Sequence, residues 1–420
     1  MTSFVEALRV WARIGLLSFG GPAGQIALLH KEVVETRKWL EENEFLNALN
    51  FCMLLPGPEA QQLTTYCGWK LHGTKGGLAA GLLFVLPGAC VILALSVVYA
   101  LVGNVPLVQA LFYGIKCAVL AIVLEALVKV ARKALKRTLD WFIAAAAFVA
   151  LFVFGLPFAL VVMVAGLIGF VTSGGGTESA VARPSLVATA RTIGLWLVIW
   201  LVPWVGLRLV LGSQHVLTQL AGIFSTLAVV TFGGAYSVLA SLGQTMVEHT
   251  GWLTPQQMMD GFGLAETTPG PLILVGQFAS FTAANNSLGS LWAGLAGSLV
   301  FLWMTFAPCF LWIFAGAPWL EYLSAKPALR GALAAITAAV TGVILNLSLW
   351  FGLHVIFGTA SRLAGPVPVW WPDWGGFDGF ALVLAGFSGL MLIRWNSGIP
   401  KTLVFAALAG LFWHYDKSLI

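Results

Sequence analysis

Long apolar stretches restrict the fold of this chain more than any other feature. Residues 76–101, 139–172, 290–315 and 377–393 are long enough, singly or as pairs of segments, to cross a bilayer at roughly 20 residues per helix. Only 9% of the 420 residues are charged, whereas soluble globular proteins have about 25%. Because the chain also lacks the short alternating segments of a membrane barrel, the sequence predicts an all-α polytopic membrane protein embedded in the lipid bilayer.

Several other classes are not expected. Residues 1–24 lack the basic start, apolar core and cleavage site of a signal peptide, so we expect them to belong to the mature protein. Five cysteines and six histidines show no metal-binding or disulfide spacing, which favours buried or interfacial roles and predicts neither a metal nor a cofactor. The net charge of +5 indicates loops facing an anionic leaflet, not nucleic acid. Without a phosphate-binding Gly-Lys-Ser/Thr loop, an ATP-driven pump is not expected.

One segment of the chain occurs twice. Residues 19–58 align with residues 232–271 without a gap, at an offset of 213, and both copies contain Phe-Gly-Gly, a Trp-Leu pair and Pro-Gly-Pro. Shared composition alone would rarely keep three motifs in one register, so the chain is interpreted as a tandem duplication. We expect a first repeat at 1–172, a linker and an inverting transmembrane helix at 173–216, and a second repeat at 217–420.

The basic residues of the two copies are distributed differently. Those of the first copy are Lys31, Arg37, Lys38, Lys70 and Lys75. The matching stretches of the second copy, 243–257 and 282–288, contain no lysine or arginine. Because cytoplasmic loops collect these residues, the two repeats are predicted to have inverted topology, with a cytoplasmic N-terminus and an extracytoplasmic C-terminus.

Counting spans predicts that the repeated motifs form re-entrant hairpins. A basic cluster at 129–137 is also expected in the cytoplasm, and two spans separate it from Lys75, so 46–69 enters and leaves the membrane on one face. Pro-Gly-Pro would then lie near the midplane. The same reasoning applies to 258–281, and it makes 4–35 and 217–248 hairpins that turn at Phe-Gly-Gly. Crossing helices with unwound centres are the alternative.

About four spans are expected after the hairpins of each half. The expected spans are 76–101, 107–128, 139–156 and 157–172, and then 290–315, 331–357, 377–393 and 399–413, with an odd helix at 192–211.

The Pro-Gly-Pro motifs are suited to bind an anion. Pro58 and Pro271 are expected to begin half-helices, because proline costs little in the first turn. Such a helix start carries roughly half a positive charge and unpaired N–H donors, and two of them near the midplane resemble the substrate sites of secondary transporters. A tight turn without a binding role is the alternative. The candidate substrate-binding residues are Phe19, Gly20, Gly21, Pro56, Gly57, Pro58, Gln61, Gln62, Phe232, Gly233, Gly234, Thr267, Thr268, Pro269, Gly270 and Pro271.

Three basic residues are candidate counter-charges for a bound anion. Lys116 lies near the middle of an apolar span, where an unpaired ammonium is costly, so we expect it to face the interior. Its expected partner is Glu125, Glu59 or a bound anion. Arg9 and Arg13 are one helical turn apart before the first Phe-Gly-Gly, with an interfacial role as the alternative.

Three acidic residues lie at the depth of the Pro-Gly-Pro motifs. Glu59 follows the first motif directly, and Glu266 and Asp260 precede the second. A carboxylate at membrane depth is a functional candidate by default. Glu59 and Glu266 are the candidate proton-coupling residues, although Glu59 is equally suited to cap its helix.

These motifs together resemble the chromate ion transporter family, including its long two-domain members. The residues that carry the resemblance are FGGP at 19–22, FGG at 232–234, the Trp-Leu pairs, LPGPEAQQL at 55–63 and TPGPLILVGQF at 268–278. The resemblance implies a non-enzymatic transporter of the prokaryotic inner membrane that exports chromate, uses the membrane potential or the proton gradient, and confers chromate resistance. It also implies antiparallel homologous halves; a homodimer is left open.

The energetics are compatible with export. Moving one charge through the membrane potential is worth about 2.3 kcal/mol per 100 mV, so a dianion leaving a negative-inside cell gains roughly 4.6 kcal/mol per 100 mV. The first hypothesis is therefore secondary export of chromate or a similar tetrahedral dianion such as sulfate. The second is an anion channel or a carrier for another small anion, and the third is an integral membrane enzyme acting on lipid.

Overall fold

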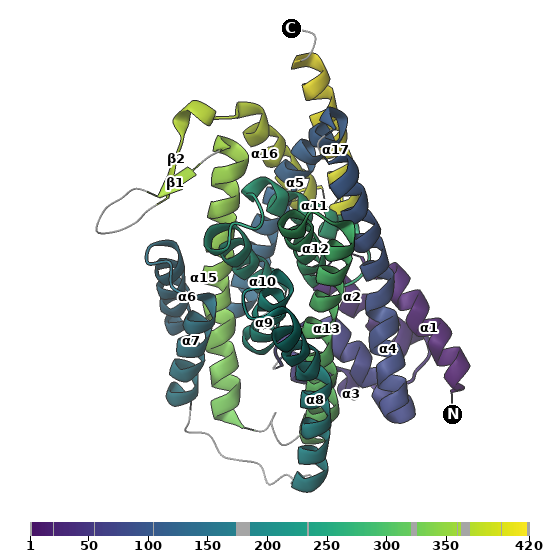
Figure 1. The fold of residues 1–420 in the computed structure, drawn as a ribbon. Helices are drawn as coiled ribbons and strands as arrows, with labels where there is room; N and C mark the ends of the chain where they lie inside the picture. Colours follow the sequence, from purple (N-terminus) through teal and green to yellow (C-terminus); the bar gives the residue numbers. More distant parts are fainter. Residues whose placement is uncertain are drawn as a thin grey trace.

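Helices make up almost all of the described chain (Figure 1). The computed structural model describes residues 2–19, 21–53, 55–103, 105–173, 185–232, 235–320, 326–358, 360–362, 370–395 and 397–417. The helices of the first half are α1 (Phe4–Leu17), α2 (Gly21–His30), α3 (Glu42–Cys52), α4 (Glu59–Val102), α5 (Pro106–Ala134), α6 (Thr138–Phe152) and α7 (Phe158–Thr172). They are followed by α8 (Leu186–Leu211), α9 (Val216–Val230), α10 (Ala235–Leu242), α11 (Pro255–Thr267), α12 (Val275–Leu288), α13 (Leu291–Gly316), α15 (Pro327–Phe357), α16 (Gly379–Ile393) and α17 (Ile399–Lys417). Strands β1 (Ala360–Arg362) and β2 (Trp370–Pro372) pair antiparallel.

Five helices in the described part are long and apolar enough to cross a membrane. They are α4, α5, α8, α13 with the turn that follows it, and α15. The spans expected at 139–156, 157–172 and 377–393 form helices α6, α7 and α16 of 15 residues each, about 22 Å long. Each half therefore has two long helices followed by a shorter pair of apolar helices, at the positions expected for its four spans.

Both Pro-Gly-Pro motifs connect two helices that fold back on each other. In the first, Lys70 Nζ near the end of the first part of α4 (59–71) lies 2.6 Å from Glu44 Oε1 at the start of α3. In the second, Asn286 Nδ2 at the end of α12 donates to Gln257 Oε1 at the start of α11, at 3.4 Å. Each pair joins the open end of a helical hairpin whose tip is Pro-Gly-Pro.

The chain ends a helix at each tip for local reasons. A residue before proline disfavours the helical conformation, and proline cannot continue a helix. Gly57 and Gly270 have φ values of +111° and +93°, a region open to glycine and closed to most other residues. Helix α4 then begins directly after Pro58, and a short 3₁₀ turn leading into α12 begins directly after Pro271.

The segments that contain Phe-Gly-Gly also turn back. Arg37 Nη1, beyond the end of α2 and the π-helical segment Lys31–Thr36, lies 3.0 Å from Glu6 Oε1 in the first turn of α1. Trp11 of α1 packs edge-on against Trp39, with ring centroids 5.5 Å apart. The second copy has the same order of elements, with α9, α10 and a second π-helical segment, Gly243–His249.

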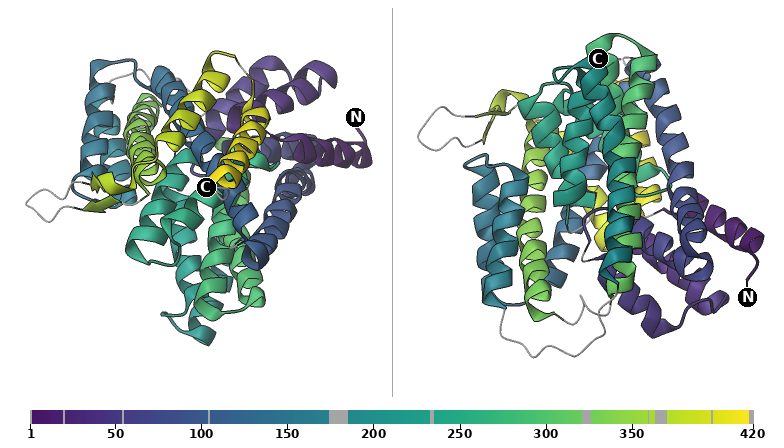
Figure 2. Two further views of the ribbon diagram at one scale, coloured as in Figure 1. Left: turned by 90° about the horizontal axis from the view of Figure 1, so that it is seen from above. Right: turned by 60° about the horizontal axis from the view of Figure 1, so that its bottom comes forward.

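The two halves exchange their terminal helix pairs. Helices α6 and α7 of the first half pack on α15 of the second, whereas α16 and α17 of the second half pack on α5 of the first. Figure 2 shows α16 and α17, in yellow, above α5 when the molecule is seen from the end where the C-terminus lies. The long helices α5 and α15 also contact each other, so the interface between the halves runs through the centre of the molecule.

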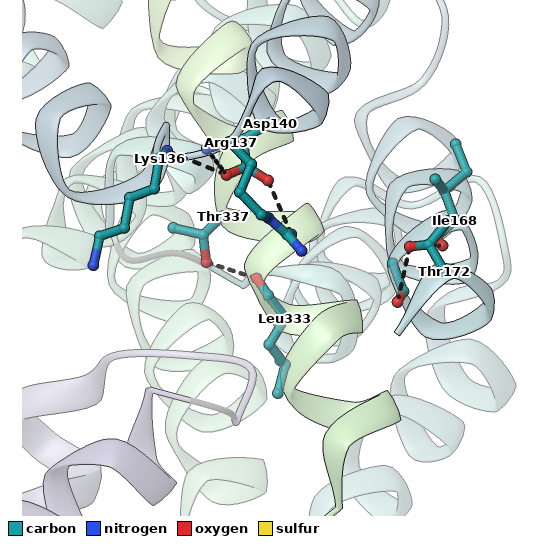
Figure 3. Close-up of polar contacts among 8 residues, drawn as sticks. Lys136, Arg137, Asp140, Ile168, Thr172, Leu333 and Thr337 are labelled. Atoms are coloured by element: carbon teal, nitrogen blue, oxygen red, sulfur yellow. Dashed lines mark hydrogen bonds and ion pairs between the residues drawn. The ribbon is translucent and has the colours of Figure 1, made fainter. Parts of the chain in front are cut away.

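In Figure 1, α17 ends at the top of the view and α1 begins at its lower right. Helix α5 runs from Pro106 to Ala134 and is followed by the basic residues Lys136 and Arg137. Figure 3 shows the hydrogen bonds by which Asp140 caps the N-terminus of α6. Its Oδ2 accepts hydrogen bonds from the backbone N–H groups of Lys136 and Arg137, and its Oδ1 is 3.1 Å from Arg137 Nη2.

Candidate functional site

Each Pro-Gly-Pro tip is hydrogen-bonded to the residue that precedes Phe-Gly-Gly in the opposite copy. The Gly57 N–H donates to the Thr231 carbonyl at 2.8 Å, and the Gly270 N–H donates to the Ser18 carbonyl at 2.8 Å. The offset of 213 that relates the two copies carries Gly57 onto Gly270 and Ser18 onto Thr231. The two hydrogen bonds are therefore equivalent under this offset.

The long helices approach the same tips reciprocally. In α4, Gly88 follows Pro87, and a Cβ atom built on Gly88 would lie 2.2 Å from the Pro269 carbonyl oxygen. In α13, Cys309 follows Pro308, and its Sγ would lie 3.2 Å from a Cβ atom built on Gly57. Each half thus packs a helix residue that follows a proline against the other half's tip.

Glutamine side chains satisfy the carbonyl groups of the tips. Gln62 Nε2 donates to the Pro56 carbonyl at 2.7 Å, and Gln25 Nε2 donates to the Gly270 carbonyl at 2.6 Å. The Gln61 amide donates to Thr65, and the hydroxyls of Thr267 and Thr268 donate to their own helix. Much of the predicted polar set therefore serves the neighbouring backbone.

Two features of the tips leave polar groups without a side-chain partner among the described residues. Pro58 and Pro271 supply no side-chain cap to the helices that follow them. The Oε1 atoms of Gln61 and Gln62 accept no hydrogen bond among the described residues.

A cavity of about 770 Å³ lies on one side of the tips. Its mouth is at the end of the molecule where α4 ends and α5 begins. Its polar lining consists of Tyr99, Gln109, Tyr113, Lys116, Thr254, Gln256, Gln257, Asp260, Thr282, Asn285, Asn286, His354, Asp378 and His414. No residue of either Pro-Gly-Pro motif belongs to the lining.

The inner end of this cavity contains a buried ion pair. Along α5, the cavity-lining residues Gln109, Tyr113 and Lys116 are spaced by four and three residues, so they lie on one face. Lys116 is ten residues from the start of α5, or about 15 Å into the molecule. Its Nζ lies 3.4 Å from Asp260 Oδ1, and both side chains are buried.

A tyrosine holds the carboxylate of this pair. The Tyr99 hydroxyl donates to Asp260 Oδ2 at 2.6 Å. Tyr99 is itself placed by edge-on contacts with Phe112 and Phe278. Nearer the mouth, the Tyr113 hydroxyl donates to Asp378 Oδ2 at 2.6 Å, so two tyrosine–aspartate pairs line the cavity at different depths.

The structure brings some of the predicted residues together and separates others. Lys116 faces the interior as expected, but its partner is Asp260, whereas Glu125 pairs with Lys129 at 2.6 Å. Arg9 and Arg13 are exposed on α1, away from the cavity, and Arg13 lies 3.9 Å from Glu32.

The remaining predicted residues lie near the tips or outside the described chain. Pro56, Gly57, Pro58, Pro269, Gly270 and Pro271 are buried, Glu266 is buried, Glu59 is partly buried, and Phe19 is 41% exposed. Gly21 begins α2, and Phe232 is partly buried beside Thr231. Gly20, Gly233 and Gly234 lie outside the described residues.

Sequence reasoning did not identify Tyr99, Tyr113, His354 or Asp378 as cavity residues. A tyrosine near the end of a span is typical of the membrane interface, so the position of Tyr99 in the sequence did not indicate that it lines a cavity. The pairing of Lys116 with Asp260 joins residues that are far apart in the chain. The sequence indicated only that a buried ammonium needs a partner, without indicating which residue supplies it. Within the described ranges, no group of three His, Cys, Asp or Glu residues could hold a metal ion.

Comparison with known proteins identifies the family. The sequence profile described as Chromate transporter matches residues 5–170 and 218–411. A probable chromate transport protein of Synechococcus elongatus is 27% identical over 425 residues, covering 98% of this chain and 96% of that protein. Chromate transport proteins of Cupriavidus metallidurans and Pseudomonas aeruginosa are 27% and 28% identical, over 81% of this chain and 80% and 79% of theirs.

No solved structure matches the chain. The profile nevertheless covers most of both repeats, and the long apolar helices agree with it. The chain is a multi-pass membrane protein that belongs to the chromate transporter family.

Proposed function

We propose that the protein exports chromate, or a similar tetrahedral dianion such as sulfate, across the plasma membrane. The observation that carries this proposal is the polar cavity, which leads from one end of the molecule to the buried Lys116. A buried ammonium at the end of a water-accessible cavity attracts an anion, because its interaction is much less screened there than in bulk water. The relatives named as chromate transport proteins supply the identity of the anion.

The two repeats are proposed to face opposite sides of the membrane. This proposal is supported by the reciprocal hydrogen bonds of Gly57 and Gly270, by the exchanged helix pairs, and by the start of α1 and the end of α17, which lie in the lower and upper parts of Figure 1. The Pro-Gly-Pro hairpins would then be re-entrant, with their tips meeting near the midplane. The end with the cavity mouth would be extracytoplasmic, since the basic residues after α5 lie at the other end.

In this arrangement the hairpin tips separate the cavity from the cytoplasmic side. Their glycines allow the close backbone approach described above, and the uncapped helix starts after Pro58 and Pro271 offer N–H groups to an anion that passes between them. Glu59 and Glu266 are the proposed proton-coupling residues, because both lie at this depth.

Membrane vesicles test the proposed function. Right-side-out and inverted vesicles containing the protein are loaded with labelled chromate, and pH and potential are set independently. We expect a saturable flux toward the positive side, since an inside-negative potential of 100 mV favours dianion exit by about 4.6 kcal/mol, roughly a thousandfold gradient. Glu59→Gln and Glu266→Gln, compared at equal abundance, are expected to remove any dependence on the imposed pH gradient.

Growth provides the matching cellular measurement. Chromate-sensitive cells that express the protein should tolerate more chromate and accumulate less of it than cells with an empty vector. Unchanged tolerance and accumulation would exclude chromate export. A flux that does not saturate would instead indicate a channel, and a flux carried only by another small anion would indicate a different carrier.

A further inference from the structure

The Lys116–Asp260 pair has a geometry that suits exchange of its anionic member. A charge-assisted hydrogen bond between an ammonium and a carboxylate is about 2.7–2.9 Å long, but Nζ and Oδ1 are 3.4 Å apart. Oδ1 accepts no hydrogen bond from the described residues, whereas Oδ2 is held at 2.6 Å by Tyr99. Asp260 is therefore fixed mainly by Tyr99, and it lies beside Lys116 as a counter-charge.

The pair is placed where an entering solute would reach it. Tyr99, Lys116 and Asp260 are the innermost polar cavity residues of α4, α5 and α11, and no other described basic residue lines the cavity except His354 and His414. An anion that enters from the mouth passes amide side chains of Gln109, Gln256 and Gln257 before it meets the ammonium.

The duplicated chain serves as an internal control for the structural importance of this pair. The offset of 213 places Asn47 at the position of Asp260. Helices α5 and α15 begin at Pro106 and Pro327, and this alignment places Thr337 at the position of Lys116. Thr337 donates to the Leu333 carbonyl of its own helix at 2.8 Å (Figure 3). The repeated framework thus accepts two neutral residues where the cavity has an ion pair.

A buried ion pair is also a weak source of stability, because desolvation of the charges offsets their attraction. The framework does not require it, and it lies at the inner end of an open cavity. We infer that Lys116 is the anion-binding cation of the cavity and that Asp260 is a resident competitor, which a dianion displaces from Lys116 and which helps the dianion to leave.

The competition determines which class of anion binds. At equal distance a dianion interacts with Lys116 twice as strongly as a carboxylate does, so it can replace Asp260. A monoanion such as nitrate gains no more from Lys116 than Asp260 already supplies. The site therefore favours divalent oxyanions, and this inference rests on the proposed function for its connection to transport.

Binding to the purified full-length protein tests the inference separately from transport. Sodium sulfate is titrated into the protein by calorimetry, and sodium nitrate is the monovalent comparison. The Asp260→Asn variant is expected to bind sulfate at least about tenfold more tightly than the wild type and to bind nitrate measurably. Its rate of chromate transport in vesicles is expected to be lower than that of the wild type. Unchanged sulfate affinity in this variant would overturn the role of Asp260.

The double variant Lys116→Thr/Asp260→Asn keeps the test decisive if Asp260→Asn does not fold. It reproduces the neutral residues of the other repeat, so we expect a thermal unfolding midpoint close to that of the wild type together with loss of sulfate binding by more than tenfold. Wild-type sulfate affinity in the double variant would show that the pair is only structural.

A matched control uses the other ion pair of α5. Glu125→Asn/Lys129→Thr removes the 2.6 Å pair outside the cavity and should retain wild-type sulfate affinity; loss of binding there would overturn the assignment to Lys116. A wild-type protein that binds sulfate but moves neither chromate nor sulfate in vesicles would refute the proposed function and leave this inference standing. A wild-type protein that binds no dianion would refute the inference itself.

Discussion

At the scale of single residues, Gly88 determines how closely the two halves approach. A Cβ atom there would lie 2.2 Å from the Pro269 carbonyl oxygen, so α4 and the tip of the second hairpin would have to separate. Gly88→Ala is expected to destabilise the protein by about 1–3 kcal/mol, as overpacking does, which detergent-solubilised protein would show as a lower thermal unfolding midpoint.

Gly206 of α8 is the matched control for this substitution. No atom lies within 4 Å of a Cβ atom built there, and alanine in a helix interior is about 0.5–1 kcal/mol better than glycine. Gly206→Ala should therefore leave the unfolding midpoint unchanged or raise it. Equal effects of the two substitutions would contradict the close approach at the tip.

At the scale of elements, the two half-helices that follow Pro-Gly-Pro end in different turns. Gly73 has φ +62° and ψ −154°, whereas Gly289 has φ +62° and ψ +28°. The first conformation is essentially restricted to glycine and costs other residues about 1–3 kcal/mol, while asparagine tolerates the second. Neither site has an atom within 4 Å of an added Cβ.

Asparagine substitutions therefore distinguish the two turns. Gly73→Asn is expected to lower the unfolding midpoint and the yield of folded protein, and Gly289→Asn is expected to change both much less. Size-exclusion chromatography of the solubilised variants measures the yield. A larger loss for Gly289→Asn would mean that the turn between the two parts of α4 is not formed as described.

At the scale of the whole molecule, the proposed orientation can be measured directly. Ser213 follows α8 and Lys136 follows α5, and both are exposed. The contacts of α8 with α13 place Ser213 at the end with the cavity mouth, since Trp303 donates to the Ile199 carbonyl and Trp319 donates to Thr189. Lys136 lies at the opposite end, because α5 begins beside the mouth.

Cysteine labelling in cells tests this orientation. With Cys90, the exposed native cysteine, replaced by serine, a membrane-impermeant maleimide should label Ser213→Cys in intact cells. Lys136→Cys should react only after permeabilisation. Labelling of both positions in intact cells, or of neither, would contradict a protein that crosses the membrane between them.

Much of the helical architecture could be predicted from the sequence. The apolar stretches indicated membrane helices because burial in lipid requires apolar side chains and internally paired backbone groups. The alignment of the two copies predicted where α3, α4, α11 and α12 break, since proline and a glycine of positive φ act locally. Helices α7 and α16 lie within two residues of their expected bounds, but α6 ends at Phe152 and not at 156, because an apolar run shows composition more clearly than it shows where a helix ends.

The candidate site was only partly predictable. The sequence by itself determined that Lys116 needs a partner and that two motifs recur at a fixed offset, because desolvation costs and backbone conformations depend on residue type. Which carboxylate meets Lys116, which tyrosine holds it, and which turn receives the Gly57 and Gly270 N–H groups were decided by tertiary structure. Each of these contacts joins the first repeat to the second, and the partners are 144 to 252 positions apart in the chain. The distance in space between such residues is fixed by helix packing, not by local sequence.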